Sequence, residues 1–557
     1  MLHSHLPYAR MAGRWPHGEE WIHEAASETY IPLLNALYAL REEDVDYKLT
    51  IGLTPVLVEQ LADEDIKDNF DAYLDEKIAM AKADVVRYSE EETADPHLAY
   101  LAEFYRGFYE GIKTDFDDKY NRDIPGAFRN LQDSGHVEIV TCGATHGYLP
   151  LLGRDSAIYG QLKTAVEAYK RHFGQEPRAI WLPECAYRPA YIKDDGTTRP
   201  GLEHWLQEMG LKLFFSETHT IEGGQPVGVA AGDVIGPYGA IKRRYVVPVQ
   251  QSIPIREATT FKPYYVSDTT AGEDADQHSG VAVLGRHNRT GMQVWSADWG
   301  YPGDFDYREF HKKDARSGMQ YWRVTGSGVS LGEKDYYHPE WAAGKVIGHA
   351  EHFAHLVADN LRHYHDATGE FGIISSNYDT ELFGHWWFEG VTWIKEVLRR
   401  LADDPDVELV RASDYIEAHP PEQVLHIPES SWGMGGNHWT WDNHETHWMW
   451  GPMHAAEKRL EDLVAAFPDP SEDEEAVLNQ AARELLLAES SDWPFLVTTG
   501  QARDYAIRRF TRHIERFEAL AGSLEQGKAD RQLADELYET DKVFPAIDYR
   551  WFAARSE

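Results

Sequence analysis

Short apolar runs separated by longer helical or polar segments constrain this chain more than any other feature. Short runs of four to six residues that are mainly apolar are typical of buried parallel strands. They therefore predict an α/β fold. The predicted strands are Tyr47–Gly52, Val137–Cys142, Ala179–Leu182, Leu211–Ser216, Ile373–Ser376 and Val407–Val410.

Polar and ionisable residues follow these runs directly. A β/α barrel carries its chemistry on the loops after its strands, so this arrangement favours a barrel over an open doubly wound sheet. No glycine-rich nucleotide-binding motif follows any early strand, which argues against a nucleotide-binding fold. The strand-end residues are Thr145-His146, Glu184, Glu217 with His219, Asp379 with Glu381, and Ser413-Asp414, and His3 and His5 fit the same set.

The organisation along the chain changes three times. Residues 61–129 are charged with helical periodicity, which predicts a helical insertion. Residues 221–291 are rich in Gly, Pro, Thr and Asp without a helical period, which predicts a long ordered loop over the barrel mouth. Residues beyond Pro420 are mainly helical, with a solvated turn expected at Ser471–Glu475. The predicted domains are a catalytic barrel (1–60 and 130–418), the insertion (61–129) and a C-terminal helical domain (419–557).

The formal net charge of −39 argues against nucleic acid as a partner, because a phosphate backbone would be repelled over most of the surface. A neutral polysaccharide meets no such penalty. The excess of 93 acidic over 54 basic residues fits an ordinary acidic enzyme or a protein kept soluble at high salt, where charges are screened.

No apolar run approaches the roughly 18 residues that would span a bilayer, so we expect no membrane insertion. The sequence opens on Met1-Leu2-His3 without a basic region followed by an apolar one, which predicts a cytoplasmic protein. The two cysteines, Cys142 and Cys185, lie in strand-like runs and are expected to be buried thiols, although a bridge between them stays open.

Two carboxylates are candidates for catalysis. Glu184 follows a buried strand in Trp181-Leu182-Pro183-Glu184-Cys185, and Asp379 occupies the same position in Asn377-Tyr378-Asp379-Thr380-Glu381. The aromatic run 383–388 after Asp379 is denser than a core alone explains. Two carboxylates at strand ends among aromatic residues describe a glycosidase site. The competing interpretation is that both are structural carboxylates paired with cations.

Histidines offer a second kind of chemistry. His3 and His5 lie on the same side of a strand and could hold a metal ion, with His349, His352 and His355 as further ligands at helical spacing. No cysteine or compact carboxylate cluster accompanies them, and sugar hydroxyls also need neutral donors and acceptors. We therefore predict sugar contacts for the first pair, a polar helix face for the second group, and no metal or cofactor.

Tryptophan is abundant at 18 residues, and five tryptophans crowd into positions 432–450. Glycines in this segment allow tight backbone turns, while indole faces can stack on pyranose rings. We expect about two of the five to contact sugar and the rest to belong to the core. They are Trp432, Trp439, Trp441, Trp448 and Trp450.

Several motifs together resemble glycoside hydrolase family 57, and within it the 1,4-α-glucan branching enzymes with a C-terminal helical domain. The likeness covers nearly the whole chain. The motifs are Leu2-His3-Ser4-His5-Leu6-Pro7-Tyr8, Gly13–Trp21, Ala144–Pro150, Trp181–Tyr187, Trp295–Asp304, Tyr378–Trp387, the glycine-rich segment after Trp432, and Ser490-Ser491-Asp492-Trp493-Pro494-Phe495.

This resemblance implies a distorted barrel of seven β/α units with a helical insertion and a helical C-terminal domain. It implies that Glu184 is the nucleophile and Asp379 the general acid/base. It also implies substrate contacts for His3, His5 and His146 around the cleaved bond, for Trp295, Trp432 and Trp441 along the cleft, and for Tyr238 on a mobile loop that favours transfer. One departure is that Met1-Leu2 leaves a very short first strand.

The expected function is cleavage of α-1,4-glucan with retention, followed by transfer to a 6-hydroxyl to form α-1,6 branches. An α-amylase or a 4-α-glucanotransferase would use the same site. A non-catalytic glucan-binding protein would keep the aromatic cleft without the chemistry, and a metal-dependent hydrolase would act through the histidines. We expect a monomer or a homodimer.

Overall fold

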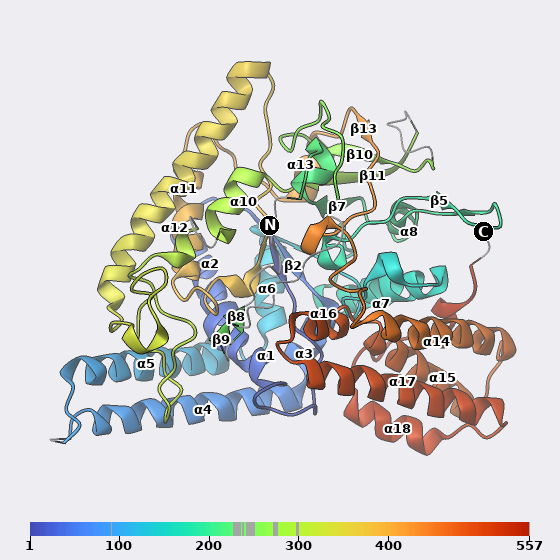
Figure 1. Ribbon diagram of the computed structural model, residues 1–557, viewed down its shortest axis with the longest axis horizontal. Coiled ribbons are helices and arrows are strands. Elements are labelled where there is room, and N and C mark those ends of the chain that lie inside the picture. The colour runs from blue at the N-terminus through green and yellow to red at the C-terminus, as the bar shows by residue number, and fades with distance from the viewer. Residues whose placement is uncertain are drawn as a thin grey trace.

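Seven parallel strands lie at the centre of the computed structural model (Figure 1). The structure describes residues 1–90, 92–226, 235–236, 239–240, 251–270, 277–296 and 300–555. One sheet has the order β12-β1-β2-β3, and a second contains β11-β7-β4. The strands are β1 (Leu2–Ser4), β2 (Leu49–Leu53), β3 (Val137–Val140), β4 (Ala179–Ile180), β7 (Leu213–Ser216), β11 (His278–Gly285) and β12 (Tyr378–Asp379).

Two isolated parallel bridges join the sheets into a ring. Thr141 pairs with Ile180 between the ends of β3 and β4, and Arg286 pairs with Ser375 between β11 and the chain that leads into β12. All neighbours around the ring are parallel. The fold is thus a distorted (β/α)7 barrel, with its seams at these two bridges.

The short first strand, β1, is a member of this ring, between β12 and β2. Leu2 pairs with Ile51 on one side and with Tyr378 on the other, and the amino group of Met1 donates a hydrogen bond to the Ser376 carbonyl at 2.9 Å. Three residues therefore suffice to hold β1 in place, because both of its edges are bonded.

Two predicted strands are corrected. Val407–Val410 forms no strand, and the side chains of Val407, Leu409 and Val410 are only half-buried. Ser413 and Asp414, which follow this run, lie away from the strand ends that carry the chemistry: Ser413 N–H bonds Glu138 near the start of β3, and Asp414 pairs with Arg178. The run Ile373–Ser376 contributes only the bridge at Ser375, and the strand itself begins at Tyr378.

The segment 221–291 holds a strand that sequence patterning missed. β11 is eight residues long, pairs in parallel with β7, and pairs antiparallel with β10 (Tyr264–Ser267). The predicted loop is therefore in part a barrel strand and its edge hairpin. Minor strands are β5 (Tyr191–Ile192), β6 (Thr198–Arg199), β8 (Ile235–Gly236), β9 (Gly239–Ala240) and β13 (Val424–Leu425).

Helices surround the ring (Figure 1). They are α1 (Glu20–Ala25), α2 (Ile31–Glu42), α3 (Pro55–Ala62), α6 (Ile124–Asp133), α7 (Asp155–Phe173), α8 (Leu202–Glu208), α9 (Thr218–Glu222), α10 (Asn288–Trp295), α11 (Pro339–Thr368), α12 (Gly390–Asp403) and α13 (Ala412–Ala418).

Two long helices project beyond this layer and pack side by side (Figure 1), namely α4 (Glu64–Arg87) and α5 (Pro96–Thr114). Each begins at an aspartate, Asp63 or Asp95, whose carboxylate accepts hydrogen bonds from the free backbone N–H groups of the first turn. They lie in the segment predicted as a helical insertion. The domain boundaries themselves stay predictions.

The C-terminal helices pack together as a bundle beside the barrel (Figure 1). The expected turn at Ser471–Glu475 is instead the start of a helix, because Ser471 and Glu474 form a reciprocal capping box and the acidic side chains suit a helix N-terminus. The helices are α14 (His447–Ala466), α15 (Glu472–Ala488), α16 (Asp492–Thr499), α17 (Arg503–Glu525) and α18 (Arg531–Thr540).

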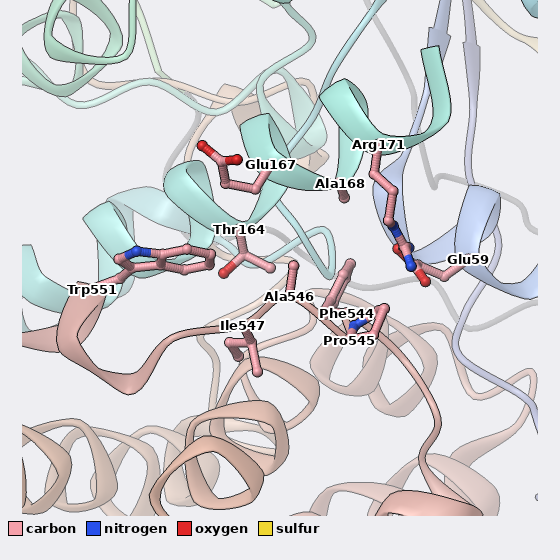
Figure 2. Close-up of a pocket in the computed structure, with 10 residues that line it drawn as sticks. All are labelled: Glu59, Thr164, Glu167, Ala168, Arg171, Phe544, Pro545, Ala546, Ile547 and Trp551. Atoms are coloured by element: carbon pink, nitrogen blue, oxygen red, sulfur yellow. The ribbon is translucent and has the colours of Figure 1, made fainter. Parts of the chain in front are cut away.

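The chain beyond α18 returns to the barrel and packs against α7. Figure 2 shows residues Phe544 to Ile547 facing Thr164 and Ala168, beside the ion pair of Arg171 with Glu59. Further along, Phe552 is 1 % exposed and lies against Gly160, where a Cβ atom would meet its ring at 2.2 Å. The segment after α18 thus connects the C-terminal helices to α7 of the barrel.

Two further expectations concern thiols and membranes. Cys142 and Cys185 are both free and buried, as predicted. Across the described ranges, no helix is long and apolar enough to cross a bilayer.

Phe552→Ala should destabilise the protein by about 3–5 kcal/mol, because it empties a buried site against α7. The midpoint of urea unfolding measures this effect. Phe371→Ala is the matched control, since Phe371 is 87 % exposed and should shift the midpoint very little. Equal shifts for the two variants would contradict this packing.

Candidate active site

The candidate site forms where the barrel strands end. His3 lies in β1 and His5 directly follows that strand. His146 follows β3, Glu184 follows β4, and Asp379 is the last residue of β12. His146 and Glu184 both have left-handed backbones, with φ of 59° and 61°. Non-glycine residues rarely adopt this conformation, and they keep it where surrounding contacts enforce it, often at functional sites.

The Glu184 carboxylate accepts one hydrogen bond on each oxygen. The indole Nε1 of Trp432 donates to Oε2 at 2.7 Å, and the hydroxyl of Ser491 lies 3.0 Å from Oε1. His146 Nδ1 is 3.7 Å from the same Oε1. The side chain is therefore held in one orientation by partners that lie 248 and 307 residues away along the chain.

Three imidazole rings and an indole form a stack beside this carboxylate. The ring centroids of His5 and His146 are 3.8 Å apart, and those of His3 and Trp181 are 4.9 Å apart. His3 Nε2 and His146 Nε2 are 3.1 Å apart, so one ring donates to the other. Burial, with His5 as a further cause, holds the pKa of His3 and of His146 well below the ordinary value, so both are neutral.

His5 carries the positive charge of this group. Burial opposes its protonation, but the Asp492 carboxylate, at 3.0 and 3.1 Å from Nε2, raises its pKa above the usual value. Glu184 and Glu381 add to this effect. A single imidazolium therefore faces several carboxyl groups.

Burial is the largest cause of a raised pKa in three carboxyl groups of the site. Burial raises the pKa of Glu184 to about 7. For Asp379, burial together with the charges of Glu381 and Glu184 raises the pKa to about 8. The pKa of Glu381 rises to about 7, chiefly through burial, while the Tyr30 hydroxyl donates to this carboxyl. Two carboxyl groups that influence each other, one accepting two hydrogen bonds and one tending to keep its proton, can divide the roles of nucleophile and acid.

The predicted aromatic residues lie at different depths. Trp432 contacts Glu184, and half-buried Trp295 points its Nε1 at the Asn377 carbonyl, two residues before Asp379, at 3.5 Å. Trp441 is 0 % exposed and stacks on Tyr148 at 4.4 Å, and its contact with sugar stays a prediction. Tyr238 lies outside the described residues.

The histidines on α11 do not join the site. His349 Nδ1 and His352 Nδ1 bond the hydroxyls of Tyr307 and Tyr301 at 2.7 and 2.6 Å, and His355 is exposed, as expected of a polar helix face.

His3, Cys142 and His146 lie close enough to share a metal ion. The two imidazoles already bond each other, and burial raises the pKa of the Cys142 thiol well above its ordinary value. An ion would thus have to displace both a hydrogen bond and a tightly held proton.

Sequence reasoning gave no role to Ser491 and Asp492, although the motif that contains them was noted. Both stand at the start of α16 and reach the barrel residues Glu184, His146 and His5. The available signal was a run of short polar side chains ahead of a helix, which alone predicts only a cap. Nothing local in the sequence indicates that this run meets a strand end.

The fold and the site together indicate an enzyme of the β/α-barrel class, with a pair of carboxyl groups at the ends of the strands. The family model of glycosyl hydrolase family 57 matches residues 1–428, and a second model, described as 1,4-alpha-glucan branching enzyme, C-terminal, matches residues 452–552. This chain belongs to glycosyl hydrolase family 57.

Individual relatives are similar over the whole length. A 1,4-alpha-glucan branching enzyme of Thermococcus kodakarensis is 44% identical, covering 98% of this chain and 77% of the relative. The crystal structure of the family 57 branching enzyme of that archaeon, in complex with glucose, matches with a TM-score of 0.87 at 42% identity, over 100% of this chain and 96% of that chain. The alpha-amylase AmyC of Thermotoga maritima matches with a TM-score of 0.81 at 31% identity, over 100% and 98%.

Asp379→Asn should change how stability depends on pH. The folded-state pKa of Asp379, about 8, lies above its ordinary 3.8, so folded protein holds a proton that the unfolded chain releases, and stability is lost as pH rises between these values. The asparagine variant lacks this loss. Its Tm relative to the unsubstituted protein should therefore rise between pH 5 and pH 8, by on the order of 1–2 °C. A constant difference would refute the raised pKa.

Proposed function

We propose that this chain is a 1,4-α-glucan branching enzyme, which cleaves an α-1,4 bond and transfers the freed chain to a 6-hydroxyl. The observation that carries the proposal is the match of residues 452–552 to the C-terminal domain of 1,4-alpha-glucan branching enzymes, and Glu184 and Asp379 at the strand ends supply the chemistry. The full-length likeness to a branching enzyme and the match to its C-terminal domain support the substrate class.

Glu184 acts as the nucleophile. With its two oxygens held by Trp432 and Ser491, its carboxylate attacks the anomeric carbon while Asp379 donates its proton to the departing glycosidic oxygen. The product is a glucosyl ester on Glu184 and a free chain end. This order needs Glu184 ionised and Asp379 protonated, which matches the lower pKa of Glu184.

Asp379 then acts as a base. Its carboxylate takes the proton of a 6-hydroxyl on a second glucan chain, and that oxygen displaces Glu184 from the anomeric carbon. Two inversions give net retention and an α-1,6 bond. Water in the place of the acceptor gives hydrolysis instead.

The surrounding residues bind the sugar at the cleaved bond. The neutral rings of His3 and His146 line the subsite of the cleaved bond, and protonated His5 offsets the charge of the carboxylates. Trp295 and Trp432 shape the cleft, and Tyr238 is proposed to favour transfer over hydrolysis. The enzyme needs no cofactor, acts as a monomer or homodimer, and is cytoplasmic.

Hydrolysis without branching is the second candidate function. The likeness to the alpha-amylase AmyC extends over this whole chain at 31% identity, and the same pair of carboxyl groups would serve either reaction. Proton NMR of amylose after incubation separates the two, because branching creates α-1,6 anomeric signals and hydrolysis creates reducing ends. Debranching the product should then release the transferred chains.

Glu184→Gln should lower both transfer and hydrolysis by about 10³-fold or more, since loss of a covalent nucleophile costs up to ~10⁶ in other enzymes. The same NMR assay measures both products. Phe371→Ala, on the exposed surface, serves as the control with unchanged rates. Appreciable turnover by Glu184→Gln would exclude this nucleophile, and loss of activity on adding a chelator would favour metal-dependent hydrolysis instead.

The pH dependence of kcat/KM should be a bell with its optimum between about pH 7 and pH 8. Activity rises as Glu184 ionises, since its pKa is about 7, and falls as Asp379 loses its proton, since its pKa is about 8. Initial rates on amylose across pH 5 to 10 test this expectation. A flat profile over that range would contradict the assignment of the two roles.

A further inference from the structure

The hydroxyl of Ser491 takes part in two hydrogen bonds, although Ser491 belongs to the C-terminal helices and not to the barrel. Its hydroxyl lies 3.0 Å from Glu184 Oε1 and 2.8 Å from His146 Nδ1. Its backbone N–H also donates to the His146 carbonyl at 3.0 Å, and the neighbouring Ser490 pairs with Gly147. The backbone therefore holds the hydroxyl in place independently of its own bonds.

A hydroxyl has only one proton, so the direction of one of these hydrogen bonds fixes the direction of the other. If Ser491 donates to Glu184, then His146 must donate from Nδ1 to Ser491, because two facing lone pairs at 2.8 Å repel. His146 is neutral, so its Nε2 is then an acceptor, and His3 donates to it from Nε2. The chain runs from His3 through His146 and Ser491 to an ionised Glu184.

The reverse direction needs one more proton. If Ser491 donates to His146 Nδ1, then Glu184 must itself be protonated to bond Ser491, and His146 donates to His3. The remaining proton of His3 then sits on Nδ1, which is buried without a partner among the described residues. In the first arrangement the same Nδ1 is an unpaired acceptor, so the two arrangements differ in the proton on Glu184 and in the tautomers of the two imidazoles. The geometry therefore couples the ionisation of Glu184 to the tautomer of His146.

We propose that Ser491 is a positioning residue that selects the ionised form of Glu184, by donating its hydroxyl proton to Oε1 while accepting one from His146. This inference rests on the proposed role of Glu184 as the nucleophile. Trp432 Nε1 donates to the other oxygen. Both donors lie beyond residue 428, outside the segment matched by the family 57 model, so the barrel segment alone lacks them.

Other titratable groups also act on Glu184, and the test must separate Ser491 from them. Asp492 raises its pKa and His5 lowers it, whereas burial is the largest cause of the raised value. The titratable groups that act on it from the elements packed around it are His5, Cys142, His146, Tyr148, Cys185, Asp379 and Asp492.

Ser491→Ala should lower kcat by on the order of 10- to 100-fold and move the acidic limb of the kcat/KM profile upward by about one pH unit, because a hydrogen bond to the charged form is lost. KM should change less than kcat, since Ser491 reaches the substrate only through Glu184 and His146. Ser491→Thr keeps the hydroxyl and should restore the limb, while Ser491→Cys, a weak donor, should fall between. This graded series also decides the matter if the alanine variant fails to fold.

The matched control is Ser156→Ala. Ser156 is also buried and also donates to a glutamate, Glu461, at 2.6 Å, but this bond joins α7 to α14 outside the site. It should leave the pH profile unchanged. A fall in kcat for Ser491→Ala without movement of the acidic limb would reduce Ser491 to a merely structural role and overturn the proposal.

A second readout keeps this inference separate from the proposed function. If Glu184 loses a donor, its ionisation costs more, so the Tm of Ser491→Ala should fall further below that of the unsubstituted protein as pH rises from 6 to 9. This measurement needs no turnover. An inactive unsubstituted protein would refute the proposed function alone, and a pH-independent Tm difference would refute the role of Ser491.

Discussion

The buried carboxylate of Glu184 is the constraint around which the rest of the molecule is arranged. A carboxyl group taken out of water prefers its neutral form, and only hydrogen bonds or nearby positive charge can restore its ionisation. Here the hydrogen bonds come from Trp432 and Ser491, and the positive charge comes from His5, whose protonation depends on Asp492. Of these four residues, Trp432, Ser491 and Asp492 lie beyond residue 428. Docking of the C-terminal helices is thus a condition for the electrostatics of the barrel.

The closed ring of strands explains why these groups meet. All seven strands are parallel, so their carboxyl ends share one side, and the short β1 and β12 bring His3 next to Asp379 in register. Gly384 extends this fit, because its backbone, with φ of 101°, lies so close to Glu28 that a Cβ atom would meet the Glu28 carbonyl oxygen at 1.9 Å. The loop after β12 is thereby seated on the helix that carries Tyr30, which bonds Glu381.

Local patterns predicted the parts of this arrangement that local physics controls. The runs at β2, β3, β4 and β7 were recognised because buried strands are mainly apolar over a short length. The carboxyl groups and histidines were recognised because they interrupt that pattern at strand ends. β11 was missed because a long glycine-rich segment precedes it, and Val407–Val410 was mistaken for a strand because a short apolar run does not reveal whether a partner edge is free. The resemblance placed Trp441 in the cleft, and only the structure shows that its indole stacks on Tyr148.

By itself the sequence determined the α/β class and the helical C-terminal part, and it marked the two carboxyl groups as candidates, because strand length, helical period and residue type are local properties. The tertiary structure alone decided which groups control those carboxyl groups. Ser491 and Asp492 look like an ordinary start of a helix, and only folding brings them, across more than 300 residues, to Glu184 and His5. A pKa depends on burial and on neighbours in space, and neither can be read from the order of residues along the chain.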